Sequence, residues 1–277
     1  IKVKMEKAVL FAVASLIFFT IGDAWLKIPS EKQGALKTTF FITFFSSVVL
    51  FILSLFWKGP FGIRAIEYSA LSGIFMGTGL LFVLISLERE QMSDTMSLIP
   101  VSYLVPVLWG AFVLHESVNV YDEIGAVLIF TGTFFIMFKT LKLNLGLVPA
   151  LIGNMLWGLQ LVSFNYAVLY TRNYPLAGSF GNFVSFLFIL IFITIRKEYS
   201  FDYKFVWQTF AISVLQSLAL LSALIVESLK SVVIGFSVVA TEPALLTLMG
   251  YFIFKERITV LQMLGVASMF VGLFMLA

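Results

Sequence analysis

Long apolar stretches alternate with short charged segments from one end of the chain to the other. A helix of about 20 apolar residues is long enough to cross the hydrocarbon core of a bilayer. The charged segments, such as SEKQG and KTLKLN, are too short to fold as soluble domains. The pattern therefore predicts ten membrane-spanning helices, at residues 7–28, 38–57, 66–87, 94–114, 121–138, 145–170, 176–195, 205–227, 231–254 and 259–277.

The second half of the chain repeats the first. Segment 79–137 aligns without a gap on segment 219–277. Leucine matches are common in membrane proteins, but a shared Gly–Glu–Gly–Gly spacing is not: Gly110/Gly250, Glu116/Glu256, Gly125/Gly265 and Gly132/Gly272. Five spans per repeat is an odd number, so the halves should enter the membrane in opposite directions. We expect an all-α membrane protein whose ten transmembrane helices form two inverted five-helix repeats, 1–142 and 143–277, with a shared site near the midplane.

The composition narrows the class of protein further. The chain is 60% hydrophobic and 12% charged, which is typical of a polytopic helical membrane protein. It has no cysteine, so disulfides and thiolate metal sites are excluded. The net charge of +3 is spread over loop ends and indicates no nucleic-acid partner. There is no G-x-x-x-x-G-K-[ST] motif for ATP, so we expect no cofactor, no metal and transport either downhill or by ion coupling.

Glu242 is the main candidate for chemistry. It lies about midway between Lys230 and Lys255, so it should sit near the middle of the membrane. A charge at that depth costs about 3 kcal/mol on insertion scales, and burial disfavours the charged form of a carboxyl. Pro243 follows at once and should kink the helix beside the acid. We interpret Glu242 as a substrate-binding and proton-coupling residue; the alternative is a neutral acid that only packs helices.

Asp23 is the second acid within a predicted span. It lies four residues before Lys27, so it either pairs with that lysine near the interface or faces a cavity with Glu242. No Lys or Arg lies deep within any predicted span. Phosphorylated substrates usually need such a cation, so the cavity should favour a cation, a proton or the amine of a zwitterion.

Aromatic and polar residues at similar depth complete the predicted substrate site. Trp157 and Tyr103 are candidates for an aromatic wall around an ammonium group, although aromatics in so apolar a chain also simply pack. Asn154 and Gln160 flank Trp157 at helical spacing and can line the same cavity, or join helices. Ser102 aligns with Glu242 across the repeat and is included in the site.

Other residues have structural interpretations. Three prolines are candidate hinges for alternating access: Pro100, Pro106 and Pro243. Three glycines of the third span predict close helix contact: Gly73, Gly77 and Gly79.

Several polar residues are also expected to be structural. We interpret Asn182 and Gln216 as amides that join helices. Glu116 and Glu256 should cap or pair at the membrane surface, and His115, the one histidine, is incidental.

The segments LVPVLWGAFVLHESVNVYDEIGAVLIFTG (104–132) and LLTLMGYFIFKERITVLQMLGVASMFVG (245–272) resemble the ten-span EamA-type members of the drug/metabolite transporter superfamily. The pair Trp157–Gly158 is similar to an aromatic–glycine pair common in the sixth span of that family. The resemblance implies a central cavity between spans 1–4 and 6–9, peripheral spans 5 and 10, and alternating access for small metabolites, often outward. The acid Glu242 is not repeated in the first half of the chain, where the aligned residue is Ser102.

These observations predict a secondary transporter for a small cationic or zwitterionic metabolite, such as an amino acid, an amine or a drug-like cation, in exchange for protons. The alternatives are an uncoupled facilitator and a transporter of nucleotide sugars or phosphometabolites. An intramembrane enzyme is a remote alternative, because Asp23 has no partner aspartate at a suitable spacing. The expected partners are the lipid bilayer, the substrate and protons. We expect a monomer or homodimer in the inner or plasma membrane of a prokaryotic cell.

Overall fold

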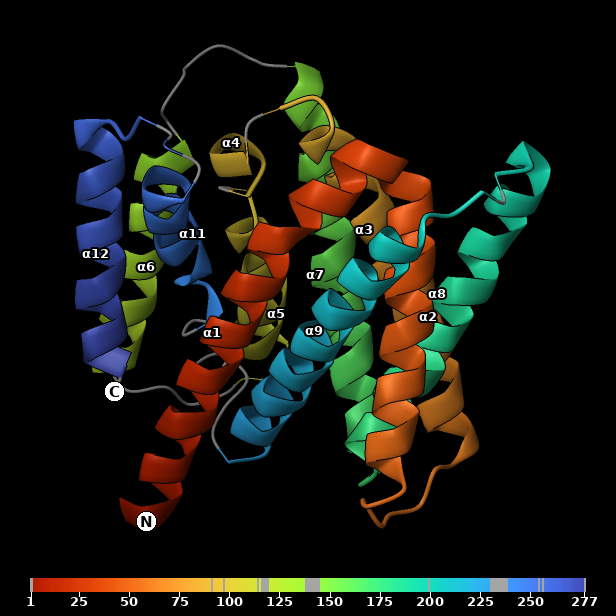
Figure 1. Cartoon of the computed structure of the whole chain (residues 1–277). Helices are drawn as coiled ribbons and strands as arrows, with labels where there is room; N and C mark the ends of the chain where they lie inside the picture. Colours follow the sequence, from red (N-terminus) through yellow and green to blue (C-terminus); the bar gives the residue numbers. More distant parts are fainter. Residues whose placement is uncertain are drawn as a thin grey trace.

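The chain is a bundle of helices (Figure 1). The computed structural model describes residues 2–90, 92–96, 98–113, 115, 120–137, 145–198, 200–229, 239–253, 255 and 257–276. Its α-helices are α1 (Lys2–Gln33), α2 (Ala35–Ser54), α3 (Ile63–Leu87), α4 (Met92–Met96), α5 (Pro100–Phe112), α6 (Val120–Met137), α7 (Val148–Leu169), α8 (Tyr174–Arg196), α9 (Tyr203–Leu229), α11 (Glu242–Phe252) and α12 (Val260–Leu276). A 3₁₀ turn, Leu145–Leu147, precedes α7.

Within the described ranges, seven helices are long and apolar enough to cross a membrane, and two shorter apolar helices lie at Glu123–Gly132 and Val260–Gly272. The same ranges contain no strand beyond an isolated bridge between Phe61 and Thr171. The chain is therefore an all-α, multi-pass integral membrane protein, as its hydropathy predicts.

Most predicted spans are confirmed to within a few residues, as α2, α3, α8 and α9 show. The first helix is longer than predicted and continues to Gln33. It ends at Gly34, whose φ of 91° lies in the left-handed region that glycine adopts at little cost.

Two predicted spans are interrupted. Span 94–114 is divided between α4 and α5, with Leu98 and Ile99 in a turn. In span 231–254, residues 231–238 lie outside the described part, Ala240 and Thr241 form a turn, and α11 begins at Glu242. The sequence predicts a kink at Pro243; in the structure the turn at Ala240 and Thr241 interrupts the helix just before it, and Pro243 stands in the first turn of α11. Proline fits the first helical position because its missing N–H would have no partner there.

Helices of the first half pair with helices of the second half. Helix α1 packs on α9, α2 on α8, α3 on α7, and α6 on α12 (Figure 1). The α6–α12 pair lies at one side of the bundle. Helix α5 contacts α7, while α11 contacts α1. Every main pair therefore joins residues that are far apart in the sequence.

Two of these pairs repeat the same contact with the partners exchanged. Between α2 and α8, the Ser47 hydroxyl donates to the Ser179 carbonyl (3.0 Å) and the Ser179 hydroxyl donates to the Ser47 carbonyl (2.9 Å). Between α6 and α12, a Cβ atom on Gly132 would lie 2.5 Å from the Gly265 carbonyl oxygen. A Cβ atom on Gly272 would lie 2.6 Å from the carbonyl oxygen of Gly125. Helices α6 and α12 are therefore antiparallel and in close backbone contact.

The predicted close contact along α3 is confirmed. A side chain at Gly73 would collide with the Gly181 carbonyl of α8, and one at Gly77 with the Ser185 hydroxyl. A Cβ atom on Gly79 would lie 2.8 Å from the Gly153 carbonyl of α7. Helix α3 is thus held between α7 and α8 by contacts that only glycine permits.

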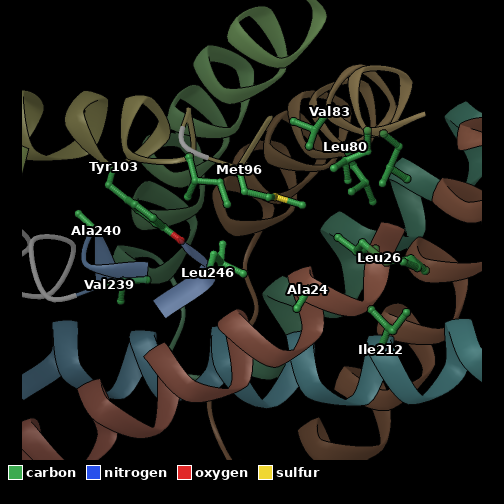
Figure 2. Packing of buried hydrophobic residues seen from close by; sticks show 14 of the residues in the cluster. Ala24, Leu26, Leu80, Val83, Met96, Tyr103, Ile212, Val239, Ala240 and Leu246 are labelled. Carbon is green, nitrogen blue, oxygen red and sulfur yellow. The ribbon is translucent and has the colours of Figure 1, made fainter. Parts of the chain in front are cut away.

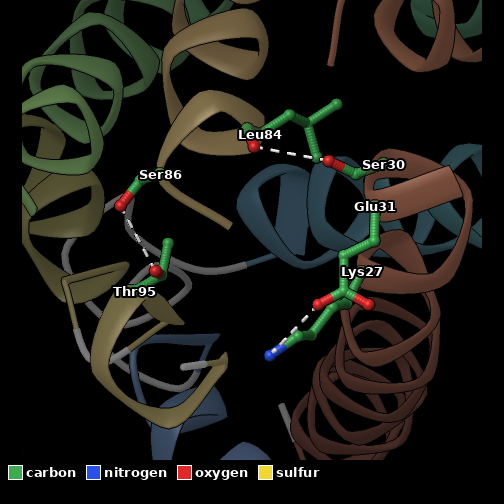
Figure 3. Close-up of polar contacts among 6 residues, drawn as sticks. All are labelled: Lys27, Ser30, Glu31, Leu84, Ser86 and Thr95. Atoms are coloured by element: carbon green, nitrogen blue, oxygen red, sulfur yellow. Dashed lines mark hydrogen bonds and ion pairs between the residues drawn. The ribbon is translucent and has the colours of Figure 1, made fainter. Parts of the chain in front are cut away.

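The largest apolar cluster lies where α1, α3, α5, α9 and α11 meet (Figure 2). Tyr103 belongs to it and extends from α5 toward α11, near Leu246. Polar contacts hold the end of α1 in place (Figure 3). Ser30 donates to the Leu84 carbonyl of α3 over 3.3 Å. The hydroxyls of Ser86 and Thr95, on α3 and α4, are also 3.3 Å apart.

The tight contact at Gly73 predicts a loss of stability on substitution. We expect Gly73→Leu to lower the free energy of unfolding by about 1–3 kcal/mol, because the added side chain must displace backbone of α8. Thermal denaturation of purified protein in detergent measures this. Gly62→Ala is the matched control, because no atom lies within 4 Å of a Cβ there. Equal melting temperatures for the two variants would contradict the expectation.

Candidate functional site

Asp23 lies on the buried face of α1, against α9. Its neighbour Gly22 allows a close approach, since a Cβ atom there would lie 3.2 Å from Cγ of Gln216. The Gln216 amide Nε2 donates to Asp23 Oδ1 over 2.8 Å. Only 4% of the Asp23 surface is exposed. The carboxyl is therefore held by a neutral donor from another helix.

Glu242 is the first residue of α11 and is fully buried. The Tyr103 hydroxyl of α5 donates to Glu242 Oε2 over 3.1 Å. Oε1 has no N–H or O–H donor among the described residues. The start of a helix is also a favourable place for an acid, because the unpaired N–H groups of the first turn carry partial positive charge.

The two acids meet each other. The carboxyl groups of Asp23 and Glu242 lie near each other, although they are far apart in the sequence. Together with Tyr103 and Gln216 they form what we call the carboxyl cluster, with one member each from α1, α5, α9 and α11. Two like charges about 4 Å apart repel by about 4 kcal/mol at an effective dielectric constant of about 20. Sharing one proton removes this repulsion.

A cavity of about 100 Å³ adjoins the cluster. Asp23 and Tyr103 line it, whereas Glu242 lies behind them. Its walls come from α1, α2, α3, α5, α7, α8 and α9, with Val239 just before α11. Helices α6 and α12 supply none of the described lining residues, in agreement with the peripheral position that the resemblance implies. Among the described lining residues, one carries a charge, the acidic Asp23.

Three further polar atoms of the cavity wall lack partners within the described part of the chain. They are Ser46 Oγ, Ser217 Oγ and Asn182 Oδ1, and all three residues are almost completely buried. The other end of the Asn182 amide is satisfied, because Nδ2 donates to the Gly178 carbonyl over 2.9 Å. Each of these oxygens can accept a hydrogen bond from a bound molecule. Burying such groups without partners is costly, which favours a polar ligand.

Comparison with known proteins identifies the family. The sequence profile of the EamA-like transporter family matches residues 6–138 and again residues 144–277. The chain belongs to this family. The two matches cover nearly all of this EamA-family chain and fall on its two halves.

Solved structures show the same fold. One crystal structure matches with a TM-score of 0.69 and 14% identity, and the alignment covers 98% of this chain and 96% of that chain. In all, 28 chains of solved structures match. No curated protein sequence is significantly similar. At this low identity the structural likeness concerns the fold alone.

The predicted site residues of this EamA-family protein lie in different environments. Ser102, Trp157 and Gln160 line the cavity together with Asp23 and Tyr103. Asn154 is fully buried but does not line it, and its Nδ2 donates to the Ala150 carbonyl over 2.8 Å.

The predicted hinges occupy distinct positions in their helices. Pro100 begins α5, Pro106 lies inside it, and Pro243 stands in the first turn of α11. Glu116 and Glu256 lie outside the described residues. His115 is exposed at a loop.

The alternative pairing of Asp23 with Lys27 is not found. Lys27 instead pairs with Glu31 over 3.7 Å, toward the end of α1 (Figure 3). This leaves Asp23 on the inner face, where it meets Gln216 and Glu242.

Sequence reasoning missed part of the site. Gln216 and Asn182 were interpreted as helix contacts, yet both line the cavity and Gln216 holds Asp23. An amide within an apolar span is a signal, but it does not say which partner it takes. Ser46 and Ser217 gave no signal, because serine is common in membrane helices.

The hydrogen bond from Tyr103 to Glu242 predicts a measurable coupling. Tyr103→Phe should cost about 1–3 kcal/mol, because it removes the donor from a buried acceptor. Combined with Glu242→Leu, which removes the acceptor, in a double-mutant cycle, the two changes should show an interaction energy of about 0.5–3 kcal/mol. Thermal or denaturant unfolding in detergent gives these values.

Tyr166→Phe is the matched control, because that tyrosine stacks on Tyr68 with ring centroids 5.3 Å apart and is not part of the cluster. Additive effects of Tyr103→Phe and Glu242→Leu would contradict the hydrogen bond.

Proposed function

We propose that this protein is a secondary transporter that moves a small molecule with a cationic amino group through the central cavity by alternating access. One observation carries the proposal: the Asp23 carboxyl stands in the wall of a cavity bordered by helices of both halves. The described lining residues include no Lys or Arg, so a phosphorylated substrate would meet no opposite charge. Amines, amino acids and drug-like cations fit this environment.

The aromatic residues of the wall support the same substrate class. Trp157 and Tyr103 both line the cavity, on α7 and α5. The face of an aromatic ring attracts a cation within about 6 Å of its centre. An acid and two rings in one cavity therefore favour an ammonium group over a neutral or anionic one.

We further propose that ten spans form two inverted repeats, 1–142 and 143–277. The exchanged contacts of α2 with α8 and of α6 with α12 support this, because a two-fold axis produces each such contact twice. The interruptions before α5 and α11 support it too, since transporters with inverted repeats place broken helices at the substrate site. Alternation of these halves would open the cavity to either side. We propose a prokaryotic plasma membrane as its location.

Proton exchange is the coupling that the carboxyl cluster favours. A carboxyl in the cavity wall can bind either a proton or a cationic group. The proton and the substrate therefore compete for this one carboxyl, and no second binding site is needed. An uncoupled facilitator would bind the substrate in the same way but would not respond to a pH gradient. Uptake driven by an imposed pH gradient in proteoliposomes distinguishes these two modes.

Loss of the cavity acid should abolish transport. We expect Asp23→Asn to reduce uptake of amines and amino acids into proteoliposomes by roughly tenfold or more, because it removes the counter-charge of the substrate. The panel includes nucleotide sugars as non-cationic solutes.

Asp202→Asn is the control, because that acid is exposed before α9 and should leave uptake unchanged. Uptake of nucleotide sugars but not of amines by the wild-type protein would overturn the proposed substrate class.

A further inference from the structure

Each acid of the carboxyl cluster accepts one hydrogen bond from a neutral side chain. The Tyr103 hydroxyl donates to Glu242 Oε2, and the Gln216 amide Nε2 donates to Asp23 Oδ1. Glu242 Oε1 receives no donor from the described residues and faces no cation among them. An oxygen that accepts nothing is the natural place for a proton, which it can then donate to a neighbouring acceptor. The Asp23 carboxyl, which lies near that of Glu242 and lines the cavity, is such an acceptor.

We propose that Glu242 keeps its proton and donates it to Asp23, and that Asp23 alone binds the primary ammonium group of the substrate. This inference rests on the proposed transport function and assigns its chemistry to particular atoms. It moves the proton-coupling role, which the sequence assigned to Glu242, to Asp23. Glu242 becomes a positioning residue, which fits its place behind the cavity wall.

The unpartnered oxygens of the cavity identify the kind of cation. A primary ammonium group has three N–H donors, whereas a quaternary ammonium has none. Asp23 can accept one of these hydrogen bonds. Asn182 Oδ1, Ser46 Oγ and Ser217 Oγ are buried acceptors in the same cavity without partners among the described residues. An ammonium with N–H donors satisfies these acceptors, whereas a trimethylated one leaves them unpaired.

Exchange follows from competition at Asp23. In the substrate-free state at low pH, Asp23 carries a proton and the cluster is neutral. When the ammonium enters, the Asp23 O–H bond breaks, the proton leaves to water, and the carboxylate accepts an N–H of the substrate. Glu242 retains its proton throughout, so the cluster is neutral in both states.

The other ionisable groups near the cluster are few. Asp23 on α1, Tyr103 on α5 and Glu242 on α11 are its titratable members, and α9 contributes the neutral Gln216. The described residues of α2, α3, α7 and α8 add no ionisable side chain to the cavity wall. Lys27 and Glu31 pair with each other further along α1.

Binding of 2-phenylethylamine and of its N,N,N-trimethyl derivative to the purified full chain tests the substrate class. We expect the trimethyl compound to bind roughly tenfold to a hundredfold more weakly, as expected for lost hydrogen bonds to charged and buried groups. Equal affinities would overturn the proposed ammonium site. Uptake of other solutes without binding of either amine would also overturn it, while leaving the transport function standing.

Two isosteric variants separate the roles of the acids. Asp23→Asn should abolish amine binding. Glu242→Gln should keep it within roughly threefold, because the glutamine amide can donate to Asp23 as the protonated acid does. The reverse result would assign the substrate to Glu242 and overturn the proposal. Thermal melting of each variant with and without amine separates a loss of binding from a loss of folding.

Measuring proton release on amine binding tests whether Asp23 carries the exchanged proton, because a residue that only packs helices would not change the number of protons released. In weakly buffered solution, amine binding should release a proton from the wild type and from Glu242→Gln, and more of it as the pH falls. Asp23→Asn should release none. Release that disappears in Glu242→Gln, with binding retained, would place the exchanged proton on Glu242 and overturn the assignment.

Asn182 and Asn154 form a matched pair for the neutral acceptors. In both, Nδ2 donates to a carbonyl one turn earlier and Oδ1 has no partner among the described residues, but only Asn182 lines the cavity. Asn182→Leu should weaken amine binding roughly tenfold, and Asn154→Leu should leave it unchanged. Equal effects would contradict a direct contact with the substrate.

Discussion

Hydrocarbon offers no hydrogen bonds, so every polar group placed in it must find its partner on another part of the same protein. The constraint is strictest for the acids Asp23 and Glu242, because an ionisable group is the most costly group to bury in a membrane. Each is held by a donor from another helix, Gln216 for the first and Tyr103 for the second, and the acids contact each other. Four helices are thereby fixed around one point. Removing any member would leave a buried carboxyl with unpaired oxygens, so folding and function depend on the same contacts.

The rest of the bundle is held by close contacts between small residues. Helix association in a membrane gains little from the hydrophobic effect and relies on close packing. Glycine and serine supply this at the α2–α8, α3–α8 and α6–α12 contacts. The cavity lies among α1, α2, α3, α5, α7, α8 and α9, and Val239, just before the turn that precedes α11, also lines it. Irregular backbone at this depth is tolerated where it is buried in protein or borders a cavity.

The sequence predicts most of the helices and the burial of Glu242, for a simple reason. Apolar length determines a membrane span almost regardless of its neighbours, and an acid in such a span is costly enough to be conspicuous. It predicts the interruptions less well. Pro243 was expected to kink the helix beside Glu242, and the structure has a turn at Ala240 and Thr241, after which α11 begins. Proline is compatible with both outcomes, and the choice depends on the packing around Ala240 and Thr241.

Which way each side chain faces could not be predicted, because a helix that is apolar all round gives no pattern to read. Asp23 was equally compatible with Lys27 and with Glu242, and the difference is decided by the rotation of α1 against α9. Gly22 permits that rotation through its contact with Gln216. The serines of the cavity were unpredictable for a further reason. A serine hydroxyl usually bonds to its own helix, as Ser102 does with the Ile99 carbonyl over 2.6 Å, so its sequence position says little about whether it is free.

Ser102 also shows that the site is less symmetric than the scaffold. It is the repeat mate of Glu242, yet its hydroxyl is satisfied within its own turn, while Glu242 depends on α1 and α5. A second acid at this position would bring another carboxyl to the cavity, where no described lysine or arginine could balance it. The proposed repeats therefore contribute unequally to the carboxyl cluster, and the proposed cation site is not repeated across their two-fold axis. In the proposed alternating-access cycle the two end states are then not equivalent for the substrate. Asp23 would lose contact with water on one side of the membrane and gain it on the other as α1 moves relative to α11, without a matching event between α7 and α5.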